Sequence, residues 1–447
     1  EITADKAFEY DECNYRRILR SMVDAFDIDA ESKTFFTRTL CGKRNSNGVV
    51  QRPSHIQLPY FYLLPKIHKK PWKTRPVVSG VSSVNEPLSK WIDYHLQQVL
   101  HLCPAYLKDS WQLLRDLKTL PPLADDTVIY SADAVAMYSN IDNDLGIDAI
   151  RRWLDLHAHQ LPAGFPVKRV LAGLDIVMRT NIFTFGNRYW RQRNGTAMGT
   201  PCACAYATIY YSYHEETVLV TADNPHGILF YRRLIDDALI IQRQRPGAHT
   251  NFLDAMNSFG APGARLEWEP TEPGRSVTFL DFTLQLNNNH GITTTTFQKP
   301  MNLYLYRPPS SAQPPSILYG LIYGSLHQYF WQNSNKRDFE RFATLLFHRL
   351  QARGHASSNL AKLFLNAAHR VDRSSIPAAK PLTNEVSLPD GSCSLHVPFH
   401  PQDTTRRELQ SLFTTSCKAA FHDDADNFDM SRLIIAYSRA PNISDLV

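Results

Sequence analysis

Asp236 and Asp237 form an acidic pair between two apolar runs of the sequence. The pair lies between the apolar runs 229–231 and 238–241. Two short apolar runs joined by a polar turn predict a strand–turn–strand unit over 228–242. Adjacent carboxylates repel each other, and a bound divalent cation would offset that repulsion. Taken alone, the pair is more often a solvated hairpin turn than a binding site.

The predicted elements change in kind along the chain. Further strands are predicted at 127–130, 184–191, 277–286 and 292–298, and helices at 15–26, 87–100, from Asp142 or Asn143, and from Thr200-Pro201. After the prolines of 308–315, helical patterns occupy 316–331, 337–353 and 358–370, with another near 404–421. Strands mixed with helices, followed by helices alone, predict an α+β fold and not a doubly wound parallel sheet.

Composition is that of an ordinary globular protein. The 447 residues predict roughly two to four domains, and 43% hydrophobic with 20% charged residues excludes a disordered or fibrous chain. Seven cysteines without a Cys-x-x-Cys pair favour a reduced, intracellular setting. The charge-free stretches contain Gly, Pro and many polar groups, so no membrane partner is expected.

Two further patterns could act together with the acidic pair. Asp133 follows the strand predicted at 127–130, and its carboxylate could meet the pair at two metal ions. Gly195 and Gly199 lie in the turn that precedes a predicted helix, where they permit tight backbone geometry under a nucleotide or a template base. In isolation, a surface carboxylate and a plain loop explain these features better.

Basic residues gather in one part of the chain, although the formal net charge is only +5. The segment 51–85 contains no Asp or Glu, and it includes Lys66, Lys69, Lys70 and Arg75 among aromatic residues. Fixed cations suit triphosphates, and interleaved aromatic rings suit nucleic acid. The alternative is a solvated basic loop.

The order of these four patterns (basic run, single Asp, Gly-rich turn, Asp-Asp hairpin) resembles the fingers and palm of reverse transcriptases. More closely, the chain is similar to the reverse transcriptases of Penelope-like retroelements over nearly its whole length, 10–447. The segments that carry the resemblance are 61–69, 75–79, 138–141, 195–201, 279–282, 298–300 and 436–443. Several motifs in the right order are far more specific than any one of them.

The resemblance implies a right-hand polymerase fold with fingers, an antiparallel-sheet palm and a helical thumb, followed by a helical C-terminal extension. The implied domains are an N-terminal extension (1–55), fingers (56–126, with 143–195 partly connecting fingers and palm), palm (127–300), thumb (301–372), and a linker with a C-terminal connector (373–447).

The resemblance also implies roles for individual residues. Asp133, Asp236 and Asp237 would be catalytic and, with Ala134, would hold two Mg²⁺ ions, or Mn²⁺ in their place. Lys66, Arg75, Tyr138 and Gly199 would bind the nucleotide. Template and primer would contact Lys69, Lys70, Gly195, Thr196, Phe279, Leu280, Asp281, Lys299, Arg341 and Arg349.

Two positions bear on the choice between polymerase classes. Tyr138 lies five residues after Asp133, where the family has its steric gate, and an aromatic ring there would exclude a ribose 2′-hydroxyl. Ile235 stands where RNA-dependent RNA polymerases usually have Gly, and both features favour DNA synthesis. In two respects the chain departs from the family. Leu234 replaces a usual aromatic residue, and no Lys follows the acidic pair closely enough to protonate pyrophosphate.

The expected partners are an RNA template, a DNA primer or target-site DNA, dNTPs, and an endonuclease module in cis or in trans. The resemblance implies a nuclear location. Two alternatives stay open at this point. One is a telomerase-like or domesticated reverse transcriptase that uses one dedicated RNA, and the other is a non-catalytic nucleic-acid-binding protein that keeps the fold.

Overall fold

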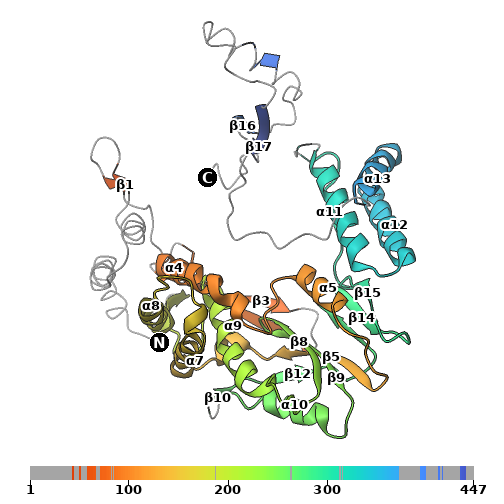
Figure 1. Ribbon diagram of the computed structural model, residues 1–447. Helices are drawn as coiled ribbons and strands as arrows, with labels where there is room; N and C mark the ends of the chain where they lie inside the picture. The colour runs from red at the N-terminus through yellow and green to blue at the C-terminus, as the bar shows by residue number, and fades with distance from the viewer. Residues whose placement is uncertain are drawn as a thin grey trace. The chain divides into compact units, whose positions relative to one another are not determined.

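The computed structural model contains mixed helix and sheet, with mainly antiparallel strand pairing (Figure 1). It describes residues 58–66, 71–81, 83, 85–186, 188–261, 264–311, 314 and 316–371, and short segments at 43–44, 50–51, 393–398, 411–412, 415 and 433–438. The chain divides into two compact units, 1–292 and 293–447. In the described part of the chain, no helix is both long enough and apolar enough to cross a membrane.

The first unit is built on a four-stranded antiparallel sheet in the order β12-β5-β9-β8. Its strands are β5 (Thr127–Ala134), β8 (Ile228–Leu234), β9 (Asp237–Arg243) and β12 (Trp268–Pro270). All residues of β9 between its two ends are buried, as the apolar run 238–241 requires. The predicted strand–turn–strand unit over 228–242 is therefore confirmed.

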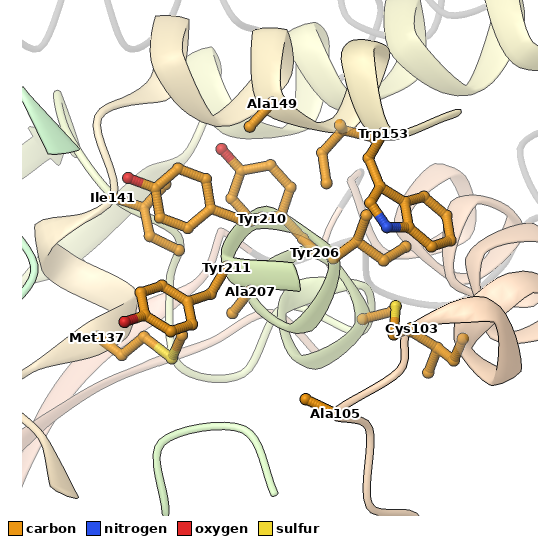
Figure 2. Close-up of a cluster of buried hydrophobic side chains, with 14 of the residues drawn as sticks. Cys103, Ala105, Met137, Ile141, Ala149, Trp153, Tyr206, Ala207, Tyr210 and Tyr211 are labelled. Carbon is orange, nitrogen blue, oxygen red and sulfur yellow. The ribbon is translucent and has the colours of Figure 1, made fainter. Parts of the chain in front are cut away.

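Helix α9 (Ala203–His214) is buried on almost every side. It packs against α7 (Asn143–Leu156) and α4 (Asn85–Val99). Figure 2 shows Tyr206, Tyr210 and Tyr211 of α9 among Trp153 of α7 and other apolar side chains. Because α9 carries no charged side chain before His214, it can be surrounded at little desolvation cost.

Capping residues in the sequence predict where α7 and α9 begin. The Asp142 carboxylate accepts hydrogen bonds from the N–H groups of Asp144 and Leu145, so the predicted cap of α7 is confirmed. The predicted start of α9 at Thr200-Pro201 is wrong by two residues, since the helix begins at Ala203. The Cys202 N–H donates to the hydroxyl of Ser89, which lies on α4, so a distant side chain serves the terminus.

A second four-stranded sheet has the order β4-β3-β6-β7. Its strands are β3 (Tyr60–Lys66), β4 (Lys73–Ser79), β6 (Ile182–Phe185) and β7 (Arg188–Arg191). The strand region predicted at 184–191 is a hairpin, in which Phe185 pairs with Arg188.

The single strand predicted at 277–286 is also a hairpin, formed by β13 (Ser276–Phe279) and β14 (Phe282–Leu286). Phe279 pairs with Phe282 across a two-residue turn, in which Leu280 has a left-handed φ of 52°. The apolar residues change parity at this turn, from odd to even positions, and that shift marks the reversal of the chain.

The remaining helices and strands complete the first unit. They are β1 (Lys43–Arg44), β2 (Val50–Gln51), η1 (Leu100–Leu102), α5 (Ser110–Lys118), α6 (Met137–Asn140), η2 (Ala158–Gln160), α8 (Val167–Arg179), η3 (Glu215–Leu219, a π-helical turn), α10 (Ala248–Met256), β10 (Gly260–Ala261) and β11 (Ala264–Arg265).

The second unit contains the three predicted helices, which are confirmed as α11 (Ser316–Gln332), α12 (Lys336–Ala352) and α13 (Ser357–Val371). They share a core that includes Leu326, Leu346, Leu350 and Leu360. Ahead of them lies β15 (Ile292–Thr296), as predicted.

The prediction of a helical C-terminal extension is wrong for 393–398 and 433–438, which are strands. β16 (Cys393–Pro398) and β17 (Leu433–Ser438) form a parallel pair, and the hydrogen bonding between them joins segments that no local pattern connects. Residues 411, 412 and 415 are helical, whereas the rest of the helix predicted near 404–421 and all of the helix predicted at 15–26 lie outside the described residues.

Candidate active site

Asp133 and the Asp236-Asp237 pair come together at one end of the central sheet. In the antiparallel pairing of β5 with β9, Asp133 lies directly opposite Asp237. Side chains that are directly opposed in this way point to the same face, with Cβ atoms about 4.5–5.5 Å apart. The Ala134 N–H donates to the Asp236 carbonyl at 2.8 Å, which ties the hairpin turn to β5.

The turn that carries Asp236 has an unusual backbone. Leu234 and Asp237 pair across a two-residue loop, in which Ile235 has a φ of 57°. Two-residue hairpin loops need a positive φ at the first central position, where Gly is the usual choice. A β-branched residue in that conformation is strained, and such strain collects at functional sites.

One acidic neighbour was missed by the sequence reasoning. Glu269 on β12 pairs directly with Asp133 from the other side, so Glu269, Asp133 and Asp237 follow one another across three strands. Both Glu269 and Asp133 are exposed. Only the strand register reveals this row, because the sequence alone does not show that Glu269 pairs with Asp133.

The donor chemistry at this end of the sheet fits Mg²⁺. Among the residues that the structure describes, no three His, Cys, Asp or Glu side chains are arranged as a ready-made metal site. Mg²⁺ usually takes one or two carboxylates together with substrate phosphates and water, and not an all-protein cage. Asp133 with Asp236 and Asp237 would supply such a partial set.

Gly195 holds the Gly-rich turn against the segment that follows Asp133. Its N–H donates to the Ile141 carbonyl, and the N–H of Thr196 donates to the Tyr138 carbonyl at 2.7 Å. Gly195 has a φ of 75°, and a Cβ there would lie 2.4 Å from the Tyr138 carbonyl oxygen. The contact is thus possible only without a side chain.

Gly199 makes the equivalent contact on the other side of the turn. A Cβ at Gly199 would lie 2.3 Å from the Val78 carbonyl oxygen, and the Val78 N–H donates to the Met198 carbonyl at 3.0 Å. Val78 belongs to β4, the strand that also carries Arg75. The Gly-rich turn therefore joins β4 to the Tyr138 segment through backbone contacts.

Tyr138 lies where these segments meet. Its hydroxyl is 3.2 Å from the sulfur of Cys204, an exposed thiol in the first turn of α9. Burial raises the pKa of Tyr138 above its ordinary value, as do the contact with Cys204 and the charge of Asp236, whereas the charge of Arg75 lowers it. The charges of Asp236 and Arg75 therefore act in opposite directions on the pKa of the Tyr138 hydroxyl.

The basic hairpin of β3 and β4 presents three cations on one face. Lys66 pairs with Lys73, and Arg75 lies two residues beyond Lys73, so all three alternate onto the same side. Lys73 and Arg75 are exposed, as are Tyr62 and Trp72 near them. Lys69 and Lys70 lie outside the described residues.

The β13–β14 turn carries the predicted primer-side residues. The ring of Phe279 is buried, so it packs inside the first unit, whereas Leu280 and Asp281 form the turn itself. The Asp281 carboxylate accepts a hydrogen bond from the Ser110 hydroxyl at 3.2 Å, which links this turn to α5.

Three predicted template or primer residues belong to the second unit. Lys299 is exposed. Arg341 forms an ion pair with Asp338 at 3.0 Å, and Arg349 donates to the Gln298 side chain at 2.9 Å and lies 3.8 Å from the centre of the Tyr304 ring.

No protein-family profile matches the chain. No curated protein matches it either. Among solved structures, it is similar to the telomerase of Candida albicans in complex with a fragment of telomeric RNA, with 12% identity over 80% of this chain and 64% of that chain and a TM-score of 0.49. It is also similar to the RNA-dependent RNA polymerase of a human picobirnavirus, with 11% identity over 69% of this chain and 60% of that chain and a TM-score of 0.43. The chain spans 55% to 64% of the telomerases that it matches.

Proposed function

We propose that this chain is an RNA-directed DNA polymerase of the Penelope-like retroelement type. It extends the 3′-hydroxyl of a DNA primer with dNTPs on an RNA template. The first unit contributes fingers (β3–β4) and palm (β5, β8, β9, β12), and α11–α13 act as the thumb.

Two geometric observations carry the proposal: Asp133 lies opposite Asp237 at the end of β5 and β9, and the Gly-rich turn joins the Tyr138 segment to β4, the strand of Arg75. The Gly-rich turn touches the Tyr138 segment and β4, and the charges of Asp236 and Arg75 both act on the Tyr138 hydroxyl. The alternative interpretations of these patterns, as a surface loop, a solvated turn and a capping carboxylate, do not predict such contacts.

Each group then has a chemical task. Arg75 and Lys66 neutralise and orient the triphosphate, and the fork of Arg75 can grip two phosphate oxygens at once. The ring of Tyr138 excludes the 2′-hydroxyl of a ribonucleotide. The Gly195–Gly199 turn supplies a flat backbone surface for the nucleotide and the template base.

In the reaction, the primer 3′-hydroxyl loses its proton to water, its oxygen bonds to the α-phosphorus of the dNTP, and the bond to the pyrophosphate oxygen breaks, so that pyrophosphate leaves. Asp133, Asp236 and Asp237 would hold the divalent ions, which when bound lower the pKa of the primer hydroxyl and neutralise the leaving group. The chain's own contribution is positioning and fixed charge, which supply most of the rate in phosphoryl transfer.

Primer extension on an RNA template tests the proposal, with dNTPs and rNTPs in separate reactions. We expect extension with dNTPs only, and its loss in Asp236→Asn, which keeps the size of the side chain and removes its charge. Asp254→Asn, on the exposed side of α10, is the matched control and should leave extension unchanged.

The other outcomes separate the alternatives. Extension that persists in Asp236→Asn would refute the metal assignment, and extension with rNTPs would indicate an RNA polymerase. Duplex binding without extension in either Mg²⁺ or Mn²⁺ would indicate a binding protein that keeps the fold. Co-purification of one RNA of fixed sequence would indicate a telomerase-like enzyme.

A further inference from the structure

Arg233 is a fully buried arginine on β8, two residues before the strained Ile235. Its Nε and Nη2 donate to the two carboxylate oxygens of Glu215 at 2.6 and 2.9 Å. Glu215 opens the π-helical turn η3, and its side chain is also buried. The carboxylate further accepts hydrogen bonds from the hydroxyls of Tyr231 and Ser212.

The rest of the guanidinium reaches the Asp236 turn. Nη1 of Arg233 donates to the Ile235 carbonyl at 2.8 Å, and Nη2 donates to the Thr208 carbonyl of α9 at 2.9 Å. The Ile235 carbonyl belongs to the peptide bond that links Ile235 to Asp236. One planar group therefore joins η3, α9 and that peptide bond.

Stability alone does not account for this arrangement. A buried ion pair gains little over well-packed apolar side chains, because desolvation cancels most of the attraction. A left-handed, β-branched residue is strained as well, and it persists only where its surroundings impose it. The hydrogen bond to the Ile235 carbonyl is a contact that can impose it.

We propose that Arg233 is a positioning residue, which holds the Ile235–Asp236 peptide so that the Asp236 carboxylate is presented to a divalent cation. Glu215 fixes the guanidinium in the plane that this requires. The inference rests on the proposed function only in that Asp236 is taken as a metal ligand. It adds a residue on the buried side of the hairpin to those that face the nucleotide.

Lysine cannot take this place, although it keeps the charge opposite Glu215. The guanidinium has donors in a rigid plane that point to several acceptors at once, whereas an ammonium is a single point on a flexible stem. Arg233→Lys should keep the ion pair and lose the reach to the Ile235 carbonyl.

The same strand offers a matched control. Arg232 is the neighbouring residue, and its Nε donates to Asp116 of α5 at 2.7 Å in a partly exposed ion pair. Arg232→Lys makes the same chemical change one residue away, without any contact to the Asp236 turn.

The experiment measures Mn²⁺ binding by electron paramagnetic resonance, single-turnover primer extension, primer–template affinity and the urea unfolding midpoint of the full chain. We expect Arg233→Lys to weaken Mn²⁺ binding and to slow extension, each about 10- to 100-fold. The affinity for primer–template should change by less than about twofold, because the binding surface is untouched. Arg232→Lys should leave Mn²⁺ binding and extension unchanged.

Ile235→Gly in the Arg233→Lys background provides a rescue. Glycine adopts a positive φ without strain, so the turn no longer needs to be held, and we expect Mn²⁺ binding to recover at least in part. If Arg233 served only to tie η3 to β8, Ile235→Gly would not restore Mn²⁺ binding.

A folded Arg233→Lys protein with unchanged Mn²⁺ binding and extension would overturn the inference. If that variant does not fold, Glu215→Gln gives the same test, because it removes the charged partner that aligns the guanidinium. A folded Glu215→Gln protein with unchanged Mn²⁺ binding would also overturn the inference. If the unchanged protein binds Mn²⁺ but extends no primer, the proposed function fails, while the Mn²⁺ data still decide the role of Arg233. Absence of Mn²⁺ binding to the unchanged protein would overturn the inference.

Discussion

Gly195 and Gly164 provide a pair of sites at which backbone strain and steric contact can be separated. Both have a φ of 75°. Around Gly164 an added Cβ meets nothing within 4 Å, whereas at Gly195 it would lie 2.4 Å from the Tyr138 carbonyl oxygen and 2.6 Å from the Ser139 Cα. These neighbours are backbone atoms, so they cannot swing aside as the end of a side chain would.

The expected costs follow from this difference. A left-handed conformation costs a non-glycine residue about 1–2 kcal/mol, and both Gly164→Ala and Gly195→Ala should lose that amount of unfolding free energy. Forcing an extra methyl group into a filled space adds about 1–3 kcal/mol, and this applies at Gly195 alone. We therefore expect a total of about 2–5 kcal/mol there.

Urea unfolding followed by tryptophan fluorescence measures the two losses, and primer extension with dNTPs and rNTPs measures the consequence for the site. Gly195→Ala should slow extension and weaken the discrimination against rNTPs, because the displaced backbone carries Tyr138. Gly164→Ala should extend as the unchanged protein does. Equal destabilisation by the two substitutions would refute the close contact between the Gly-rich turn and the Tyr138 segment.

Two further predictions concern the core of the first unit. At Gly146 on α7, an added Cβ would lie 1.8 Å from the Tyr206 hydroxyl oxygen and 2.8 Å from its Cζ. The contact should cost Gly146→Ala about 1–3 kcal/mol of unfolding free energy, partly offset by the ~1 kcal/mol that alanine gains in a helix. Adding Tyr206→Phe should restore part of the loss, and additive effects of the two substitutions in urea unfolding would count against the contact. Burial lowers the pKa of His214, although the Ala255 carbonyl and Glu215 raise it. Since the folded pKa lies below the unfolded value of about 6.5, the unfolded state binds more protons, and stability should be full above pH ~6.5 and fall as the pH drops below it. Urea midpoints measured from pH 7.5 down to pH 5 should therefore fall less steeply in His214→Gln, and an unchanged slope would refute this assignment.

Local sequence patterns were sufficient to predict those helices and hairpins whose periodicity or capping residues lie within a few positions of each other. The hairpin around Asp236, the cap at Asp142 and the three helices after Pro315 all have the periodicity or the capping residue that their structure needs. The two hairpins predicted as single strands were missed because each turn is only about two residues long and interrupts the apolar alternation too briefly to be recognised.

Features that depend on distant partners could not be predicted. The start of α9 is served by Ser89 on another helix, and β16 finds its partner in β17 across a long stretch of chain. Glu269 joins the acidic row only through strand register. Register is fixed by which faces are buried together, and a single strand does not carry that information.

The spacing of the two glycines has a physical reason that follows from these contacts. Gly195 lies against the Tyr138 backbone and Gly199 against the Val78 backbone, so one short turn must touch two segments that are far apart in the sequence. A side chain at either position would separate the predicted gate from the strand that carries Arg75. Under the proposed function, this backbone link would couple sugar selection to triphosphate binding, and we expect a substitution at either glycine to change both together.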